Sequence, residues 1–294
     1  MLGYGGGLVG GDSIDVTCSI DAGACGASVW TAADCQRVSA ATDTWCSMLT
    51  HRIMCAVIAQ LFCARRRRPR CFKATASADC VTQTFSFDLA AQATLALLPD
   101  PITCFERAKY RQKQVVRLEK GASLVLVDWL TSGRKRNFLS SGSINEKRTE
   151  IHEHWDFDEY DSQTDVYLDG TIVLSDRVRL CDDEPTALRK RMQGAHVLGV
   201  MVVLGPQMKR ISDRLLELSQ RKRLHHAKDI TPQGRLASDT DFPGVLSSAS
   251  ALGDTGGVIA RFIADDAETA MMYMRSILAP LEEGLGFKPF QENR

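Results

Sequence analysis

The chain has 294 residues, of which 44% are hydrophobic and 24% charged, proportions that are average for soluble globular proteins. This composition excludes a disordered, collagen-like or coiled-coil chain. The 36 basic and 36 acidic residues give a formal net charge of +0, so no overall field attracts nucleic acid or an acidic membrane.

The ten cysteines are irregularly spaced, and eight of them lie between Cys18 and Cys80. No Cys-x-x-Cys pair occurs, which argues against a zinc ribbon, a thioredoxin-like site and an iron–sulfur motif. The first residues lack the basic and apolar regions of a signal peptide, so we expect a reducing compartment.

Alternating polar and apolar residues predict β-strands through the first two thirds of the chain. The segment Ser13–Ile20 shows this alternation directly after a glycine-rich turn. A hairpin is expected around Asp169-Gly170, a dipeptide that favours tight turns between strands. In chain order the expected strands are 13–20, 85–89, 93–98, 115–118 and 122–130, with the hairpin at 166–175.

The last third mixes helices with strands. Apolar residues recur at helical spacing over residues 207–223 and again over 266–285, where Pro280 is expected to end or kink the helix. The other expected elements are a helix at 187–193, a strand at 196–204 and a strand pair at 245–251 and 258–263. We therefore predict a mainly β, multi-stranded fold with two or three α-helices in the C-terminal third.

Residues 37–70 differ in composition from this regular β pattern. They contain the basic run 65–70 and an apolar stretch, 48–63, that His51 and Arg52 interrupt. The stretch is shorter than the roughly 20 residues that span a bilayer, which disfavours a membrane anchor. Binding of the basic run to RNA stays open, although a solvated loop is the more common interpretation of such a run.

The glycine-rich opening does not fit a phosphate-binding loop. No Gly-Lys-Ser/Thr triplet follows it, and its glycines precede a strand, whereas a dinucleotide fingerprint leads into a helix. A tight turn packed under another segment is the better interpretation.

His152 and His154 flank Glu153, and in an extended segment both imidazoles share one face. Such a pair is able to hold nickel or zinc, but an exposed polar strand end is the alternative. A metal-dependent hydrolase at this place would need a third ligand and an open coordination position. Because no Gly-x-Ser-x-Gly motif is present either, we predict that the protein is not an enzyme.

Two phrases in the middle of the chain are more specific. Residues 124–134 read as a buried strand that ends in Asp128-Trp129 and a polar turn, which places Asp128 and Arg134 to pair or to meet a ligand. Residues 97–101 form a rigid Pro-Asp-Pro corner before another strand.

These phrases, together with residues 4–14 and 154–160, resemble the family of urease accessory protein D, called H in some bacteria. The match continues through 204–206 to 278–282, so it covers nearly the whole chain with its motifs in order. The resemblance implies a mainly β, non-enzymatic scaffold in the cytosol. Its partners would be accessory protein F, the accessory GTPase G and the urease apoprotein, with no nucleic acid and no membrane.

The resemblance also implies that nickel is in transit toward urease and that no cofactor is tightly bound. Asp12, Asp128, Glu153 and His154 are the polar groups on family-like motifs that would line a metal or water path; hydrogen bonding at strand ends is the alternative. The candidates for partner contacts or this path are Gly6, Gly7, Asp12, Arg111, Gln112, Asp128, Trp129, Thr131, Ser132, Arg134 and Trp155, and the candidate metal ligands are His152, Glu153 and His154.

The chain departs from the family pattern in three places. The family has a further strand region before the glycine motif, so the single domain 1–294 is expected to be truncated at its N-terminus, with an unpaired sheet edge. Residues 37–70 are expected to be an insert, and residues 137–151 a second one. We hypothesise that both are translated introns or gene-model errors; if they are real, they should be surface loops.

Overall fold

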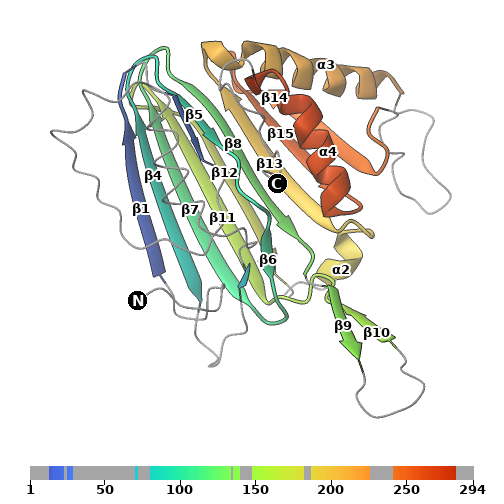
Figure 1. The fold of residues 1–294 in the computed structure, drawn as a ribbon. Helices are drawn as coiled ribbons and strands as arrows, with labels where there is room; N and C mark the ends of the chain where they lie inside the picture. The colour runs from blue at the N-terminus through green and yellow to red at the C-terminus, as the bar shows by residue number, and fades with distance from the viewer. Residues whose placement is uncertain are drawn as a thin grey trace.

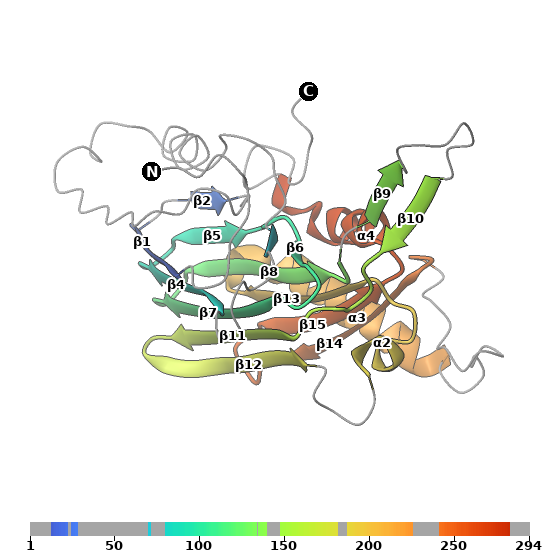
Figure 2. The ribbon, with the colours of Figure 1, turned by 90° about the horizontal axis from the view of Figure 1, so that it is seen from below.

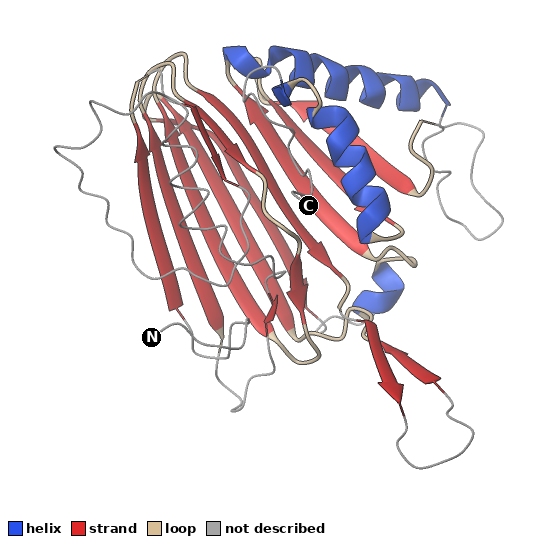
Figure 3. Cartoon of the chain, in the orientation of Figure 1, coloured by secondary structure: helices blue, strands red, loops and turns tan. Residues whose placement is uncertain are grey.

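The structure, a computed structural model, describes residues 13–22, 25–28, 70–71, 80–133, 135–139, 148–181, 187–225 and 241–282. These residues form two stacked β-sheets with helices on the outer face of one sheet (Figures 1 and 3). Figure 2 shows the same layers from below. The expected fold class, mainly β with its helices in the C-terminal third, is therefore confirmed.

The first sheet has five strands in the order β1-β4-β7-β11-β12. Its first four strands are parallel, and β12 closes the sheet antiparallel to β11. The strands are β1 (Ser13–Ile20), β4 (Val81–Leu89), β7 (Lys109–Leu118), β11 (Glu159–Leu168) and β12 (Thr171–Cys181).

The second sheet has eight strands. Six follow the order β14-β15-β13-β8-β5-β2, while β6 pairs with β8 and β3 pairs with β6. The strands are β2 (Cys25–Ser28), β3 (Arg70–Cys71), β5 (Thr94–Leu97), β6 (Ile102–Cys104), β8 (Ser123–Thr131), β13 (Val197–Leu204), β14 (Val245–Ala251) and β15 (Val258–Ala264).

The chain winds between the two sheets. It passes from β4 to β5 and β6, returns to β7, and crosses again to β8. Because each return runs through the opposite sheet, β4 and β7 are parallel neighbours in one sheet, and β5 and β8 are parallel neighbours in the other. This winding brings segments far apart in sequence face to face.

Burial along β7 and β8 shows how the sheets are covered. In β7 every second side chain from Tyr110 to Leu118 is buried, while Arg111, Lys113 and Arg117 point outward from the five-stranded sheet. All nine residues of β8 are buried, because the other sheet covers one of its faces and helices cover the other. The continuous apolar run in the sequence of β8 reflects this double cover.

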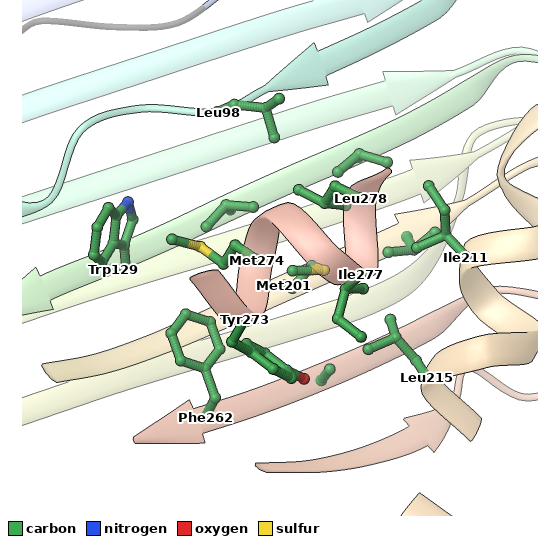
Figure 4. Close-up of a cluster of buried hydrophobic side chains, with 14 of the residues drawn as sticks. Leu98, Trp129, Met201, Ile211, Leu215, Phe262, Tyr273, Met274, Ile277 and Leu278 are labelled. Atoms are coloured by element: carbon green, nitrogen blue, oxygen red, sulfur yellow. The ribbon is translucent and has the colours of Figure 1, made fainter. Parts of the chain in front are cut away.

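Two helices cover the outer face of the eight-stranded sheet. A large apolar cluster fills the space between these helices and the sheet (Figure 4). The helices are α3 (Lys209–His225) and α4 (Ala267–Leu278). The ring of Phe262 on β15 lies 5.4 Å from the ring of Tyr273 on α4. Ile211 and Leu215 add side chains from α3, and each such buried residue contributes about 1.5 to 3 kcal/mol.

The helix boundaries follow local signals in the sequence. The carboxylate of Asp266 caps α4 by accepting a hydrogen bond of 2.7 Å from the backbone N–H of Thr269. The helix ends at Leu278, two residues before Pro280, so the predicted interruption is confirmed. The short helix α2 (Leu188–Arg191) and the 3-10 turn η1 (Pro206–Met208) precede the longer helices.

None of the helices in the described part of the chain is long and apolar enough to cross a membrane. The apolar stretch 48–63 and the basic run 65–69 lie outside the described residues, so what was predicted for them stays a prediction.

A small hairpin projects from the two sheets (Figures 1 and 2). Its strands are β9 (Lys135–Leu139) and β10 (Arg148–His152), which pair antiparallel. The expected insert at 137–151 includes most of this hairpin, whereas the expected insert at 37–70 and the glycine-rich opening lie outside the described residues, apart from Arg70. Whether either segment is foreign to the family stays a hypothesis.

Three strands begin earlier than predicted, one of them β11, which begins at Glu159 although the predicted hairpin begins at residue 166. Alternation predicts strands at 85–89 and 115–118, whereas β4 begins at Val81 and β7 at Lys109. The added residues include Gln83, Gln112 and Gln114, which are polar yet face the interior. Polar residues on both faces remove the alternation on which the prediction depends.

We expect the substitution Gly199→Ala to destabilise the fold. Gly199 on β13 lies directly opposite Phe262, and a methyl group there would lie 2.2 Å from Cζ of that ring. Overpacking of this kind costs about 1 to 3 kcal/mol, measurable as a lower midpoint of thermal or urea unfolding. Adding Phe262→Leu should recover part of the loss; strictly additive effects of the two changes would contradict the proposed clash.

Candidate functional site

A band of polar side chains divides the apolar core between the two sheets. On one side of the band lies the apolar cluster that contains Phe87 and Val116, and on the other side the cluster that contains Val81 and Phe157. The residues between them are all buried. We call them the polar band: Gln83, Gln112, Gln114, Asp128, Ser162 and Thr164.

Strand register places the band across the five-stranded sheet in two adjacent rows. Gln83, Gln112 and Ser162 are direct partners on β4, β7 and β11. Gln114 and Thr164 are direct partners in the next row. Since residues two apart on a strand share a face, both rows point to the opposite sheet.

Asp128 enters the band from the eight-stranded sheet. Its carboxylate accepts a hydrogen bond of 2.5 Å from the hydroxyl of Ser162 and contacts at 3.2 and 3.4 Å from the hydroxyl of Tyr160. Both donors lie on β11, so this carboxylate connects the two sheets through side chains alone.

The hydrogen bonds continue across two further strands, β7 and β4. Gln112 donates from Nε2 to the hydroxyl of Ser162 at 3.3 Å, and the Tyr110 hydroxyl lies 2.7 Å from Oε1 of Gln112 and 2.5 Å from Oε1 of Gln83. A hydroxyl has a single hydrogen, so these two glutamines share one donor. The result is a connected chain of polar atoms from β4 to β8.

Burial shifts the pKa values of two side chains at this site. It raises the pKa of Asp128, although hydrogen bonds from Ser162, Tyr160 and Gln112 oppose the shift. Burial also raises the pKa of Tyr160 well above its ordinary value, and the nearby Asp128 carboxylate adds to that shift. Asp128 therefore binds a proton more readily than an exposed aspartate does.

The structure brings together only part of the predicted set. Gln112 and Asp128 lie in the polar band, whereas Arg111 points to the outer face and bonds Glu159 at 3.1 Å. Trp129 also faces away from the band: it belongs to the cluster under the helices, and its indole donates to the carbonyl of Pro99 at 2.8 Å.

Thr131, Ser132 and Trp155 lie at the end of β8 in local hydrogen bonds. The hydroxyls of Thr131 and Thr103 are 2.9 Å apart. The backbone N–H of Trp155 donates to the carbonyl of Ser132 at 2.6 Å, and its indole donates to Ala195 at 2.8 Å. These hydrogen bonds hold the segment after β10 against the end of β8.

The rings of His154 and His196 pack with centroids 4.3 Å apart, and the hydroxyl of Ser132 lies 2.9 Å from Nδ1 of His196. Burial and the guanidinium of Arg189 lower the pKa of His154. Glu153 is buried against Gly133, where a methyl group would lie 2.8 Å from its Cβ. The geometry of these side chains is that of a packed strand end.

The predicted metal ligands are only partly described. Within the described residues no group of three or more His, Cys, Asp or Glu side chains is arranged to hold a metal ion. His152 lies on β10, but its side chain is not among those described, and Gly6, Gly7, Asp12 and Arg134 lie outside the described residues. The pairing predicted between Asp128 and Arg134 is therefore untested, and the described partners of Asp128 are on β11.

Sequence reasoning missed six residues of this network: Gln83, Tyr110, Gln114, Tyr160, Ser162 and Thr164. A signal was present, because Gln112 and Gln114 on one strand, and Ser162 and Thr164 on another, stand at positions two apart. Such spacing places polar residues on one face, but the sequence does not show that this face is the buried one.

Comparison with known proteins identifies relatives over the whole chain. The family model of UreD, the urease accessory protein, matches residues 1–294. The chain is 32% identical to urease accessory protein D of Arabidopsis thaliana over 74% of this chain and 72% of the relative. It is 29% identical to urease accessory protein D of Oryza sativa subsp. indica over 98% of this chain and 80% of the relative. It is 34% identical to urease accessory protein UreD of Anaeromyxobacter over 72% of this chain and 61% of the relative.

Replacing Asp128 by Asn should stabilise the folded protein at neutral pH. The pKa of Asp128 is higher in the folded than in the unfolded protein, so its ionisation opposes folding once the pH exceeds the unfolded value of about 3.9. The stabilisation by Asp128→Asn should therefore grow as the pH rises from about 4 and level off above the folded pKa. Urea unfolding at a series of pH values measures it.

Asp161→Asn is the matched control, because its carboxylate lies on the outer face of β11 beside Arg177, which lowers the pKa of Asp161. For Asp161 the effect has the opposite sign. Its ionisation favours folding above the unfolded pKa, so Asp161→Asn should slightly destabilise the folded protein at neutral pH. Equal pH dependence in the two variants would contradict the raised pKa of Asp128.

Proposed function

The chain belongs to the UreD urease accessory protein family, and on this basis we propose that it is a non-catalytic scaffold of urease maturation that helps accessory proteins F and G deliver nickel to the urease active site. We place this activity in the cytosol, with the urease apoprotein as the third partner. The polar band is the observation that supports the nickel part of the proposal.

The chemistry of the band suits a divalent cation in transit. The Asp128 carboxylate and the Ser162 hydroxyl lie within hydrogen-bond distance. Gln112 donates from its amide nitrogen to that hydroxyl and presents its amide oxygen to the hydroxyl of Tyr110. Oxygen groups are ligands for divalent metals, and each holds nickel less tightly than a set of imidazoles or thiolates would. Conduction of an ion requires sites that are favourable enough to enter and weak enough to leave.

Protonation of Asp128 fits the same role. Burial raises the pKa of Asp128, so this carboxylate takes up a proton more readily than an exposed one when no cation is present. An arriving cation would displace that proton, since metal ligands must be deprotonated. The ionised carboxylate would then offset one of the two positive charges of the cation.

Asp128→Asn is expected to lower the nickel content of urease matured with the variant, by about tenfold, because the amide keeps the shape of the site but cannot supply a negative charge. Nickel per urease active site, measured by elemental analysis after co-expression, is the readout. Capture of accessory protein F should be unchanged. Asp161→Asn, whose carboxylate faces outward, is the control that should retain full nickel loading.

Undiminished nickel loading with Asp128→Asn would remove Asp128 from the path. The comparison is informative because the same substitution is expected to make the folded protein more stable, so that a loss of loading would not come from unfolding.

A co-expression pull-down with accessory proteins F and G tests the scaffold itself. The full chain and a version that lacks residues 37–70 should be compared, and capture of both partners by either version supports the proposal. If both versions are soluble and neither captures a partner, the proposed assembly is wrong.

A further inference from the structure

The polar band reaches the side of the sandwich at β12. Asp176 on this edge strand is the direct partner of Thr164, and Thr164 is the partner of Gln114, so the three side chains form one row on the inner face. The side chain of Asp176 is 14% exposed, whereas Thr164 and Gln114 are buried. Asp176 therefore stands where the band meets solvent.

Arg261 of the opposite sheet covers the solvent end of this row. It lies on β15, and its guanidinium donates to the carboxylate of Asp176. In the eight-stranded sheet Arg261 is the direct partner of Val200, which is the direct partner of Asp128. Arg261 and Asp128 thus lie in one row of this sheet with Val200 between them, and the charge of Asp176 helps to raise the pKa of Asp128.

Burial shows that this side of the sandwich is open. On β14, Ser248 and Ser250 share the inner face with Arg261 and are exposed, so the five-stranded sheet does not extend over β14. The inward-facing Leu174 and Val178 of β12 are only partly buried. The side chain of Arg261 is 49% exposed, which leaves it free to move away from Asp176 without crossing packed side chains.

We propose that Asp176 and Arg261 form an ionic latch that closes the solvent end of the polar band, and that opening of this latch admits hydrated divalent cations to Asp128. The inference rests on the proposed function, because it names the point at which a cation would enter or leave the band. The guanidinium occupies the position of a cation on Asp176, and an arriving divalent cation would compete with it for the same carboxylate.

A latch explains features that a purely stabilising ion pair does not. Exposed ion pairs contribute little to stability, and outer-face pairs such as Arg177 with Asp161 connect neighbouring strands of one sheet. The pair of Arg261 with Asp176 instead connects the two sheets, across the row that leads to buried polar groups. Since Arg stays charged at all ordinary pH values, the latch is released by competition or movement and not by deprotonation.

The test measures access to the band directly. Thr164→Cys, in the otherwise unchanged full chain, places a thiol one residue pair inside the latch. The cationic reagent trimethylammonium-ethyl methanethiosulfonate is added, and peptide mass spectrometry gives its reaction rate at the introduced thiol apart from the native cysteines. Adding Arg261→Gln should raise this rate about fivefold, because loss of a partly exposed ion pair increases the population of the open state by about that factor.

Three comparisons make the result specific. Arg261→Lys keeps the positive charge and should restore most of the protection. Arg177→Gln removes an outer-face ion pair one residue from Asp176 and should change nothing. Native Cys104, which is buried in the same apolar cluster as Tyr160, should stay protected in every variant.

An unchanged reaction rate of the introduced thiol in the Arg261→Gln variant would overturn the latch, and so would a parallel rise at Cys104, which would show general loosening. Nickel ions alone, added to the Arg261→Gln variant, should slow the reaction of the introduced thiol; no protection by nickel would overturn the cation part of the proposal.

Urease maturation separates this inference from the proposed function. If Arg261→Gln opens the band to the reagent and also alters nickel loading of urease, both are supported. If the band opens and nickel loading is unchanged, the latch stands as a control of access, and the proposal that nickel travels through the band fails.

Discussion

A carboxyl group buried between two sheets must be hydrogen-bonded or neutral, and the arrangement around Asp128 satisfies this requirement from the opposite sheet. The hydroxyls of Ser162 and Tyr160 reach the carboxylate from β11. They do so only in the observed register, because a shift of β11 by one residue would turn both side chains outward. One buried group thus helps to specify how the two sheets face each other.

The rest of the interior is organised around that contact. Apolar clusters lie on both sides of the polar band, and a third lies under α3 and α4. Burial of apolar surface in these clusters supplies the stability of the fold, so the band does not have to. A polar row that helps to fix the register but does not have to supply this stability is free to serve binding or transport, which is the division of roles that we propose for this family member.

The band is continuous because the chain passes alternately through the two sheets and so forms parallel neighbouring strands. The glutamines of β4 and β7 and the hydroxyls of β11 come from three separate passes of the chain through one sheet. Each pass returns through the other sheet, and one of these returns, β8, carries Asp128. The same topology ends the row at β12, an edge strand, where Asp176 meets Arg261 of the second sheet. Interior and surface are therefore connected along one line of residues.

The sequence by itself determined the fold class, the two long helices, the hairpin at Asp169-Gly170 and the family, since these depend on local periodicity, turn residues and motifs in order. It also singled out Gln112 and Asp128. It did not distinguish Asp128 from Trp129, which point to opposite faces of one strand.

Only the tertiary structure decided which polar residues share a site. Gln83, Gln112 and Ser162 are 29 and 50 residues apart along the chain, and they meet because parallel strands in register place them side by side. Periodicity shows that a residue alternates between two faces, but which face is buried depends on what packs against it. That information lies in contacts between distant segments, and for this reason the polar band became visible only in the folded chain.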